Sequence, residues 1–315
     1  MKIRSFLKLV EVQTKAASMV PFIFGTVFAL FRYRRFDFWN FLFMLISLLS
    51  FDMTTTAINN YQDYKRAKKK KGFGYERHNA IVRDHLQEPT VRATILVLFA
   101  VAVTFGILLY HRTSLVALIT GIVSFAVGIL YTSGPVPISR MPLGECFSGF
   151  FMGFVIIFLS VWIQIPDQTL AYLTFADGMA DLHLDFYELL RLFLAAWPAS
   201  ACIANIMLAN NICDMQDDLE NKRYTLPIYI GKERALFLFQ GLYTSAFVSI
   251  VLLGILRILP WTVLPVLFAL IPVRKNVDAF RKLPTKEDTF IVAIQNFLLI
   301  NVSLILLVAV GILIS

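Results

Sequence analysis

The sequence predicts an all-α protein that crosses a membrane several times, and three observations support this prediction. Of the 315 residues, 58% are hydrophobic and only 16% are charged, and the mean hydropathy is +0.70. Apolar runs of about 20 residues, long enough to cross about 30 Å of hydrocarbon as a helix, recur along the whole chain. The runs are continuous and do not alternate with period two, which disfavours a β-barrel. The composition therefore excludes an ordinary soluble domain.

Nine membrane-spanning helices are expected along the chain. They cover about residues 16–31, 38–60, 90–110, 113–132, 144–164, 189–213, 233–256, 260–273 and 289–313. The eighth is short because Pro260 and Pro272 bound it. The first follows a basic segment that resembles the start of a secretory signal. No small-residue cleavage site follows it, so we expect this helix to be retained.

Lys and Arg are distributed unevenly between the two sides of the expected bundle. With the N-terminus in the cytoplasm, 23 of the 29 basic residues lie in or beside cytoplasmic segments and six lie on the outer side. The positive-inside rule favours this orientation, although "RYRR" at 32–35 opposes it. We therefore expect one transmembrane domain over residues 1–315 in the cell membrane. A polar cytoplasmic cap is expected from loops at about 61–89, 133–143, 214–232 and 274–288.

Two of the expected helices end in a similar polar pattern on the cytoplasmic side. The second ends "INNYQDYKR" and the sixth ends "ANNICDMQDDLENKR". Asn59 and Asp63 are four residues apart and share a helix face, and Asn210, Asp214 and Asp218 also step by four. One such end is readily explained as a helix that reaches the membrane interface. Two ends with the same pattern on the same side indicate that their polar faces meet at one cavity.

These residue types match a site for a metal ion and a phosphate. Carboxylates at the edge of hydrocarbon are costly unless something binds them. Mg²⁺ takes oxygen ligands, typically one or two carboxylates completed by water and substrate phosphate. The expected catalytic carboxylates are Asp63, Asp214 and Asp218, which would bind Mg²⁺ together with Asn59 and Asn210. The basic residues just beyond, Lys65, Lys222 and Arg223, suit a diphosphate.

The two acidic segments, on the second and sixth of nine helices, resemble the motifs of the UbiA superfamily of intramembrane prenyltransferases. The second motif of that family, Asp-x-x-x-Asp, is intact here from Asp214 to Asp218. The first is usually Asn-Asp-x-x-Asp-x-x-x-Asp. Asn59 and Asp63 match it, whereas Asn60 and Ala67 stand where the family has acids. The lower carboxylate count leaves the number of bound metal ions open.

A third stretch is similar to one branch of the superfamily. "LYTSGPVPISRMPLGE", residues 130–145, is similar to the Tyr-x-x-Gly-Pro-x-Pro…Pro-Leu-Gly-Glu loop of 1,4-dihydroxy-2-naphthoate polyprenyltransferases. Its prolines fix φ, so the loop is expected to be stiff and to hold side chains over the cavity mouth. Expected diphosphate contacts in this part of the site are Tyr131, Arg140 and, from the first cytoplasmic loop, Arg77. Expected substrate-cavity residues are Asp52, Asn60 and Ser133.

The resemblance implies an enzyme, a Mg²⁺-dependent prenyltransferase. It would transfer a polyprenyl group from polyprenyl diphosphate to 1,4-dihydroxy-2-naphthoate, releasing CO₂ and diphosphate and giving demethylmenaquinol. The expected partners are these two substrates and the lipid bilayer, with no nucleic acid and no obligate protein partner, and the active site is expected on the cytoplasmic side. Hydroxybenzoate, homogentisate or haem remain as alternative acceptors. A transporter of a small anion is the alternative from another class of protein. In a transporter the binding residues would be expected near the midplane of the membrane, whereas the acidic residues here are expected at one side of it.

Overall fold

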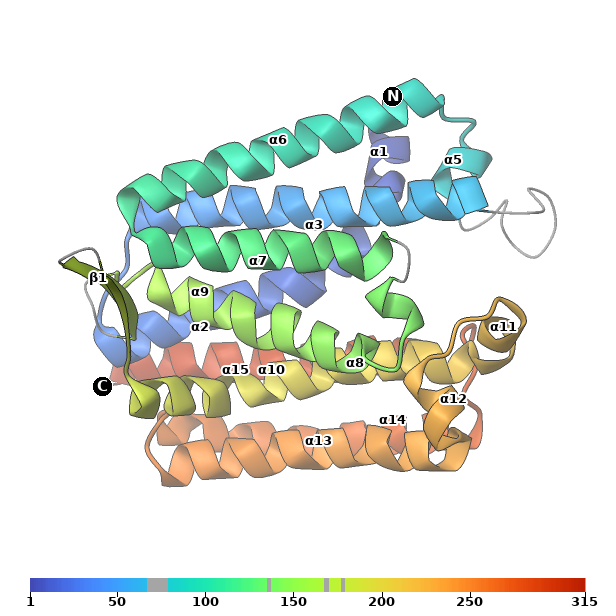
Figure 1. Ribbon diagram of the computed structural model, residues 1–315. Coiled ribbons are helices and arrows are strands. Elements are labelled where there is room, and N and C mark those ends of the chain that lie inside the picture. Colours follow the sequence, from blue (N-terminus) through green and yellow to red (C-terminus); the bar gives the residue numbers. More distant parts are fainter. Residues whose placement is uncertain (67–78, 135–136, 167–169, 177–178, 315) are drawn as a thin grey trace. The chain divides into compact units, whose positions relative to one another are not determined.

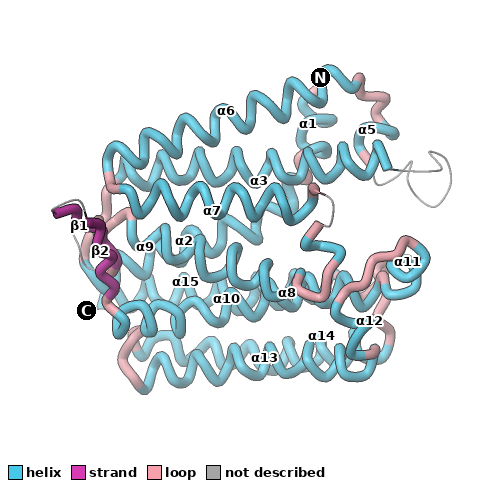
Figure 2. Tube along the Cα trace, viewed as in Figure 1, coloured by secondary structure: helices cyan, strands magenta, loops and turns pink. Residues whose placement is uncertain are grey.

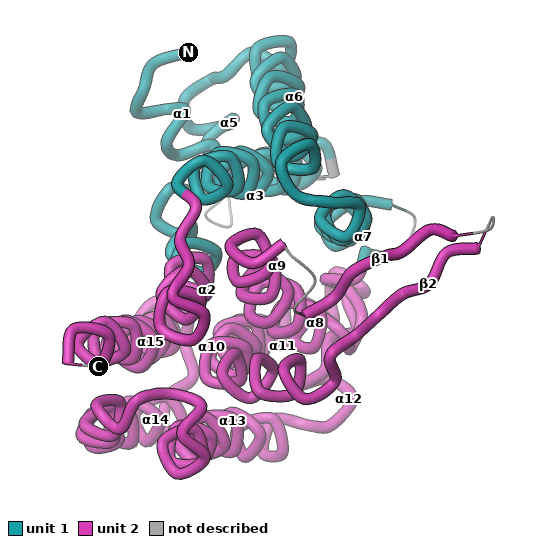
Figure 3. Tube along the Cα trace, turned by 90° about the vertical axis from the view of Figure 1, so that its left-hand side faces the viewer, with its two compact units in different colours: residues 1–19, 38–137 teal, residues 20–37, 138–315 magenta. Residues whose placement is uncertain are grey.

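The computed structural model is predominantly helical and describes residues 1–66, 79–134, 137–166, 170–176 and 179–314 (Figure 1). The chain forms two compact units (Figure 3). Unit 1 contains residues 1–19 and 38–137, and unit 2 contains residues 20–37 and 138–315. Helices dominate both units, and one hairpin of strands in unit 2 interrupts them (Figure 2).

Unit 1 is built on the long helix α3 (Phe38–Arg66), which packs along α6 (Glu88–Arg112) and against α7 (Leu115–Thr132). The rings of Phe51 and Phe125 stack between α3 and α7, with centroids 3.8 Å apart. The unit also contains three short elements: α1 (Ile3–Leu9), the 3₁₀ helix η1 (Val12–Lys15) and α5 (Ala80–Arg83). Leu9 and Ile81 pack with Ala57 of α3 in a buried apolar cluster, which fastens the short elements to the long helices.

Unit 2 surrounds the helix α10 (Phe186–Cys213), which packs against the π-helix η3 (Ser148–Val155), α13 (Lys232–Ile255) and α15 (Ile291–Ile314). The helix α2 (Ala16–Tyr33) begins in unit 1 and continues into unit 2. The other helical elements of unit 2 are η2 (Ile138–Arg140), α8 (Gly144–Phe147), α9 (Ile156–Trp162), α11 (Met215–Glu220), α12 (Leu226–Ile230), η4 (Trp261–Ala269) and α14 (Leu270–Lys282).

The hairpin pairs β1 (Ala171–Ala176) with β2 (Met179–Leu184) in antiparallel register, with Ala171 opposite Leu184. Sequence analysis had predicted no strand in this segment. The indole Nε1 of Trp162, at the end of α9, donates a 2.8 Å hydrogen bond to the carbonyl oxygen of Ala171. This contact fastens the hairpin to the preceding helix.

Eight helical stretches in the described part of the chain are long and apolar enough to cross a membrane. They confirm an all-α polytopic fold and match eight of the nine expected spans. The remaining expected span, 260–273, is built differently: the 3₁₀ helix η4 contains Pro265, which cannot donate a backbone hydrogen bond. The helix α14 then continues to Lys282 and exposes Arg274 and Lys275. Much of the expected loop 274–288 is therefore helical.

Other segments expected as loops also contain helix. The helix α3 continues to Arg66, and α5 lies within the expected loop 61–89. The expected loop 133–143 contains η2, and the expected loop 214–232 contains α11 and α12. A helical path satisfies backbone hydrogen bonds inside the segment itself, which favours it at the edge of an apolar bundle.

Close contact between η3 and α10 depends on two glycines of the π-helix. A methyl group on Gly153 would lie 2.4 Å from the Cα atom of Ser200, and one on Gly149 would lie 2.8 Å from the carbonyl oxygen of Ser200. Small residues at a helix interface let two backbones approach closely, and this is a principal means of helix association in membranes. The central helix α10 is therefore positioned by the absence of side chains on η3.

We predict that Gly153→Ala destabilises the protein by about 1–3 kcal/mol, because the added methyl overpacks the contact with Ser200. The measurement is thermal unfolding of the purified protein in detergent. Gly241→Ala is the matched control, since a methyl there meets nothing within 4 Å. Equal stability of the two variants would show that η3 can move away from α10 at little cost.

Candidate active site

The end of α10 carries the second acidic motif along a continuous helical path. The backbone N–H of Asp214 donates to the carbonyl oxygen of Asn210 at 3.1 Å, and the N–H of Asp218 donates to that of Asp214 at 2.8 Å. Each residue therefore lies one turn beyond the last, across the junction of α10 and α11. Asn210 and Asp214 are partly exposed, whereas Asp218 is only 2% exposed.

Each carboxylate of this motif is paired with a cation. Lys286, in the segment before α15, forms an ion pair with Asp214 through Nζ and Oδ2. The guanidinium Nε of Arg223 lies 3.2 Å from Oδ1 of Asp218, and the hydroxyl of Thr225 donates to Oδ2 at 3.2 Å. Burial raises the pKa of the Asp218 carboxyl, and the charge of Arg223 opposes that shift. The contacts with Arg223 and Thr225 offset part of the free-energy cost of burying this carboxyl group.

Residues 139–145, which include the start of α8, are fastened at three points to the end of α10 and to the turn after α11. Asn211 donates a 2.8 Å hydrogen bond to Oε1 of Glu145, and both residues are buried. Arg223 donates to the carbonyl oxygen of Ser139 at 3.4 Å, and the backbone N–H of Tyr224 donates to that of Arg140 at 3.1 Å. Arg140 and Arg223 are therefore held beside the acidic motif within unit 2.

The first acidic motif ends α3 in unit 1. Asn59 and Asp63 are exposed, whereas Asn60 is buried and donates to the carbonyl oxygen of Leu9 at 2.9 Å and to Oε1 of Glu11 at 3.1 Å. Adjacent helical residues point about 100° apart, which explains this division. The side chain of Asn60 thus binds the N-terminal segment.

Two other expected residues of α3 also have partners in unit 1. Lys65 forms a 2.8 Å ion pair with Glu88 at the start of α6. Asp52 forms a 2.6 Å ion pair with the buried Lys15, and the hydroxyl of Ser18 donates to its other oxygen at 2.5 Å. Lys15 also donates to Thr56 at 2.6 Å. A carboxylate within an apolar span is therefore neutralised inside the unit.

The remaining expected residues are distributed over both units. Tyr131 and Ser133 lie at the end of α7, and the buried hydroxyl of Ser133 has no hydrogen-bond partner among the described residues. Lys222 is exposed in a left-handed backbone conformation, with φ 54°. Arg77, together with Ala67 of the first motif, lies outside the described residues.

The donors at the end of α10 suit a hard divalent cation. Asp214 and Asp218 supply carboxylate oxygens one turn apart, and Asn210 supplies an amide oxygen one turn earlier. Such a set leaves coordination positions for water and phosphate oxygens, as Mg²⁺ prefers. No group of three or more His, Cys, Asp or Glu side chains is gathered closely enough to hold a metal ion within the described ranges. The two carboxylates of the second motif, Asp214 and Asp218, can therefore supply only part of the coordination sphere of a metal ion.

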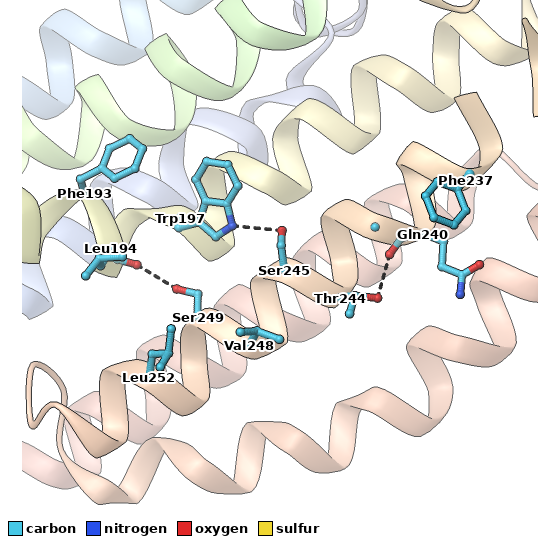
Figure 4. Close-up of a pocket in the computed structure, with 11 residues that line it drawn as sticks. Phe193, Leu194, Trp197, Phe237, Gln240, Thr244, Ser245, Val248, Ser249 and Leu252 are labelled. Atoms are coloured by element: carbon cyan, nitrogen blue, oxygen red, sulfur yellow. Dashed lines mark hydrogen bonds between the residues drawn. The ribbon is translucent and has the colours of Figure 1, made fainter. Parts of the chain in front are cut away.

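A groove of about 660 Å³ lies elsewhere in unit 2, between α10 and α13 (Figure 4). Phe193, Trp197 and Leu252 are among its mainly apolar lining. Its serine hydroxyls are already bonded, Ser245 to the Trp197 indole at 3.0 Å and Ser249 to the carbonyl oxygen of Leu194 at 3.0 Å. Both helices are candidate membrane spans. The groove therefore suits hydrocarbon better than a diphosphate.

Sequence analysis missed several residues that contact the second motif. Thr225 lies seven residues after Asp218, and its position after "NKRY" was a usable signal. Glu145 matched a motif, but nothing in the sequence indicated Asn211 as its partner. Lys286 lies 72 residues beyond Asp214 and had no local signal.

Comparison with known proteins identifies the family. A model of the UbiA prenyltransferase family matches residues 18–298. The chain belongs to this family. It is 31% identical over 314 residues to the 1,4-dihydroxy-2-naphthoate octaprenyltransferase of Bacillus subtilis strain 168, which covers 98% of this chain and 92% of that protein. The protein is thus a multi-pass membrane prenyltransferase, which excludes the transporter alternative.

Solved structures of archaeal UbiA homologues share the fold. A homologue from Archaeoglobus fulgidus bound to GPP and Mg²⁺ matches with a TM-score of 0.67 and 11% identity, covering 98% of this chain and 99% of that chain. The apo structure of a homologue from Aeropyrum pernix K1 matches with a TM-score of 0.65 and 16% identity, covering 94% of this chain and 97% of that one.

We predict that Lys15→Met lowers stability by about 3–5 kcal/mol, because the carboxylate of Asp52, only 14% exposed, is left without its cation. The double variant Lys15→Met/Asp52→Asn removes both charges and should recover most of the loss. Thermal unfolding of the wild type, both single variants and the double variant completes the cycle. Additive losses would contradict a coupling between the two residues.

We predict that Glu145→Ala lowers the free energy of unfolding by about 1–3 kcal/mol, because the buried amide of Asn211, in the last turn of α10, loses its hydrogen-bond acceptor. The variant should also lower the rate of prenyl transfer. Glu145→Gln keeps that acceptor. Its new N–H group also provides a donor where Oε2 of Glu145 and Oδ1 of Asn211 have none among the described residues. Glu145→Gln should therefore retain stability, as measured by thermal unfolding beside the rate of turnover. If Gln is as damaging as Ala, an ionised carboxylate is required.

Proposed function

We propose that the protein transfers a polyprenyl group from polyprenyl diphosphate to 1,4-dihydroxy-2-naphthoate in a Mg²⁺-dependent reaction that releases CO₂ and diphosphate. The paired carboxylates Asp214 and Asp218 at the polar end of a membrane-spanning helix carry the proposal. The naphthoate acceptor is supported by the loop at 130–145 and by the name of the Bacillus subtilis relative. The alternative is the same transfer to another aromatic acceptor.

In this proposal Asp214 and Asp218, with Asn210, are the ligands of a divalent cation in unit 2. Asn59 and Asp63 of α3 are the proposed ligands from the first motif, which has two carboxylates fewer than the usual pattern. The bound Mg²⁺ would neutralise the charge that develops on the departing diphosphate. Arg140 and Arg223, fastened beside the motif, would bind diphosphate oxygens, and Lys65, Lys222, Arg77 and Tyr131 are further proposed contacts. Asp52, Asn60 and Ser133 are proposed for the substrate cavity, where Asp52 and Asn60 act through their contacts with the N-terminal segment.

The membrane location favours this substrate pair. A polyprenyl tail is hydrocarbon, and each buried CH₂ contributes about 0.8 kcal/mol. The tail can lie among apolar spans while the diphosphate stays at the polar helix ends. The charge distribution of the loops supports a site on the cytoplasmic side of the cell membrane.

The test is conversion by the purified protein in detergent with Mg²⁺, a polyprenyl diphosphate and 1,4-dihydroxy-2-naphthoate, read by the mass of the prenylated product. Asp63→Asn, Asp214→Asn and Asp218→Asn should each lose about tenfold to hundredfold in rate, because a metal site weakens by such factors when its ligand environment is disturbed. Asp217→Asn is the matched control, since Asp217 is exposed on the same short helix.

The three outcomes are distinct. Product from the wild type and the control, with loss in the three variants, supports the proposal. Turnover only with a different aromatic acceptor overturns the naphthoate assignment and keeps the reaction type. Full activity after exhaustive removal of divalent metal, or in the Asp214→Asn variant, overturns the proposed role of the second motif.

A further inference from the structure

The acidic motif at the end of α10 is charge-balanced within unit 2. Asp214 faces Lys286 and Asp218 faces Arg223, so each carboxylate of the motif has one cation beside it. A divalent cation that binds these carboxylates must therefore share them with a positive charge or displace it. Like charges at such short range repel strongly in a partly buried site.

The two cations differ in how firmly they are held. Arg223 is fixed by its backbone N–H to the carbonyl oxygen of Asp218 at 2.8 Å and by its guanidinium to the carbonyl oxygen of Ser139 at 3.4 Å. Its partner Asp218 has only 3% of its side chain exposed. The side chain of Lys286 is 48% exposed, and Asp214 is its partner through Nζ. Arg223 is part of the local fold, whereas Lys286 is attached mainly through one charged contact.

The segment that carries Lys286 does not depend on that contact. Thr285 accepts a 3.0 Å hydrogen bond from the backbone N–H of Phe290, and its own N–H donates to the hydroxyl of Thr289 at 3.1 Å. That hydroxyl also donates to the carbonyl oxygen of Leu283 at 2.5 Å. The backbone around Lys286 therefore stays in place when the flexible stem of the lysine swings away from Asp214.

We propose that Lys286 is an exchanging counter-ion, which occupies Asp214 in the absence of metal and moves onto the diphosphate when the metal binds. This inference rests on the proposed function. The charge balance disfavours a bare divalent cation and favours a cation that arrives with the negative diphosphate. Lys286 is thus a positioning residue that couples the binding of metal to the binding of the prenyl diphosphate.

The coupling gives effects of opposite sign on two binding constants. Without Lys286, the competitor at Asp214 is gone, so the metal alone binds more tightly. The diphosphate loses a cation, so it binds more weakly to the metal-loaded protein. A lysine that only stabilised the fold would weaken both, and a solvated lysine would change neither.

The experiment uses the full-length protein purified in detergent. Mn²⁺ alone is titrated by calorimetry, and labelled inorganic diphosphate is then titrated at saturating Mn²⁺. The variants are Lys286→Met and Lys286→Gln. Lys282→Met is the matched control, because it removes the same charge from an exposed position at the end of α14. Asp214→Asn tests the metal site itself.

We expect both Lys286 variants to bind Mn²⁺ about fivefold or more tightly and inorganic diphosphate about fivefold or more weakly, a coupling within the usual range between sites. The control should match the wild type. If the two binding constants are unchanged in the Lys286 variants, or change in the same direction, the proposed exchange of Lys286 is wrong. In that case the proposed metal site still stands, provided that Asp214→Asn weakens Mn²⁺ binding. Wild-type Mn²⁺ binding by Asp214→Asn overturns the proposed function instead.

Discussion

A charged group in an apolar bundle needs a partner of opposite charge or a strong hydrogen bond, and this constraint organises the polar residues of both units. Lys15 neutralises Asp52 within unit 1. In unit 2 the buried Glu145 accepts from Asn211. An unpaired charge in such surroundings costs several kcal/mol. Both of these carboxyl groups, which look anomalous in an apolar sequence, therefore have a partner, and each pair fastens two segments that are distant along the chain.

The acidic end of α10 extends this constraint from stability to chemistry. A metal ligand must be ionised, yet Asp218 is almost completely buried, and burial favours its neutral form. Arg223 and Thr225 offset that tendency and are supplied by the turn that follows the motif. The same arginine reaches the loop before α8, so the residues that stabilise the carboxylate also hold the neighbouring loop in place.

The position of this site depends on close backbone packing deeper in unit 2. The glycines of η3 allow that π-helix to approach α10 at Ser200, on the same helix that ends just before Asp214. The helix α8 continues directly into η3. The close packing of η3 on α10 therefore supports both the loop that contains Arg140 and the end of α10 next to Asp214. Rigid support of this kind keeps charged side chains in register when a ligand replaces their protein partners.

The sequence by itself determined the helical fold and the spacing of the acidic motifs. Hydrocarbon leaves a spanning backbone few options besides a helix, so run length and composition suffice to predict the spans. A four-residue step places Asn210, Asp214 and Asp218 on one face in any helix. The sequence missed the irregular η4 and the hairpin, where proline and short alternation gave weak signals.

Tertiary structure alone decided which partner each polar group has. Asn59 and Asn60 look alike in sequence, but only Asn60 turns into the N-terminal segment, because neighbouring helix positions point in different directions. Lys286 meets Asp214 from 72 residues away. Such pairings depend on how the chain returns to the same place after α11, α12, α13, η4 and α14, and no local pattern encodes that path.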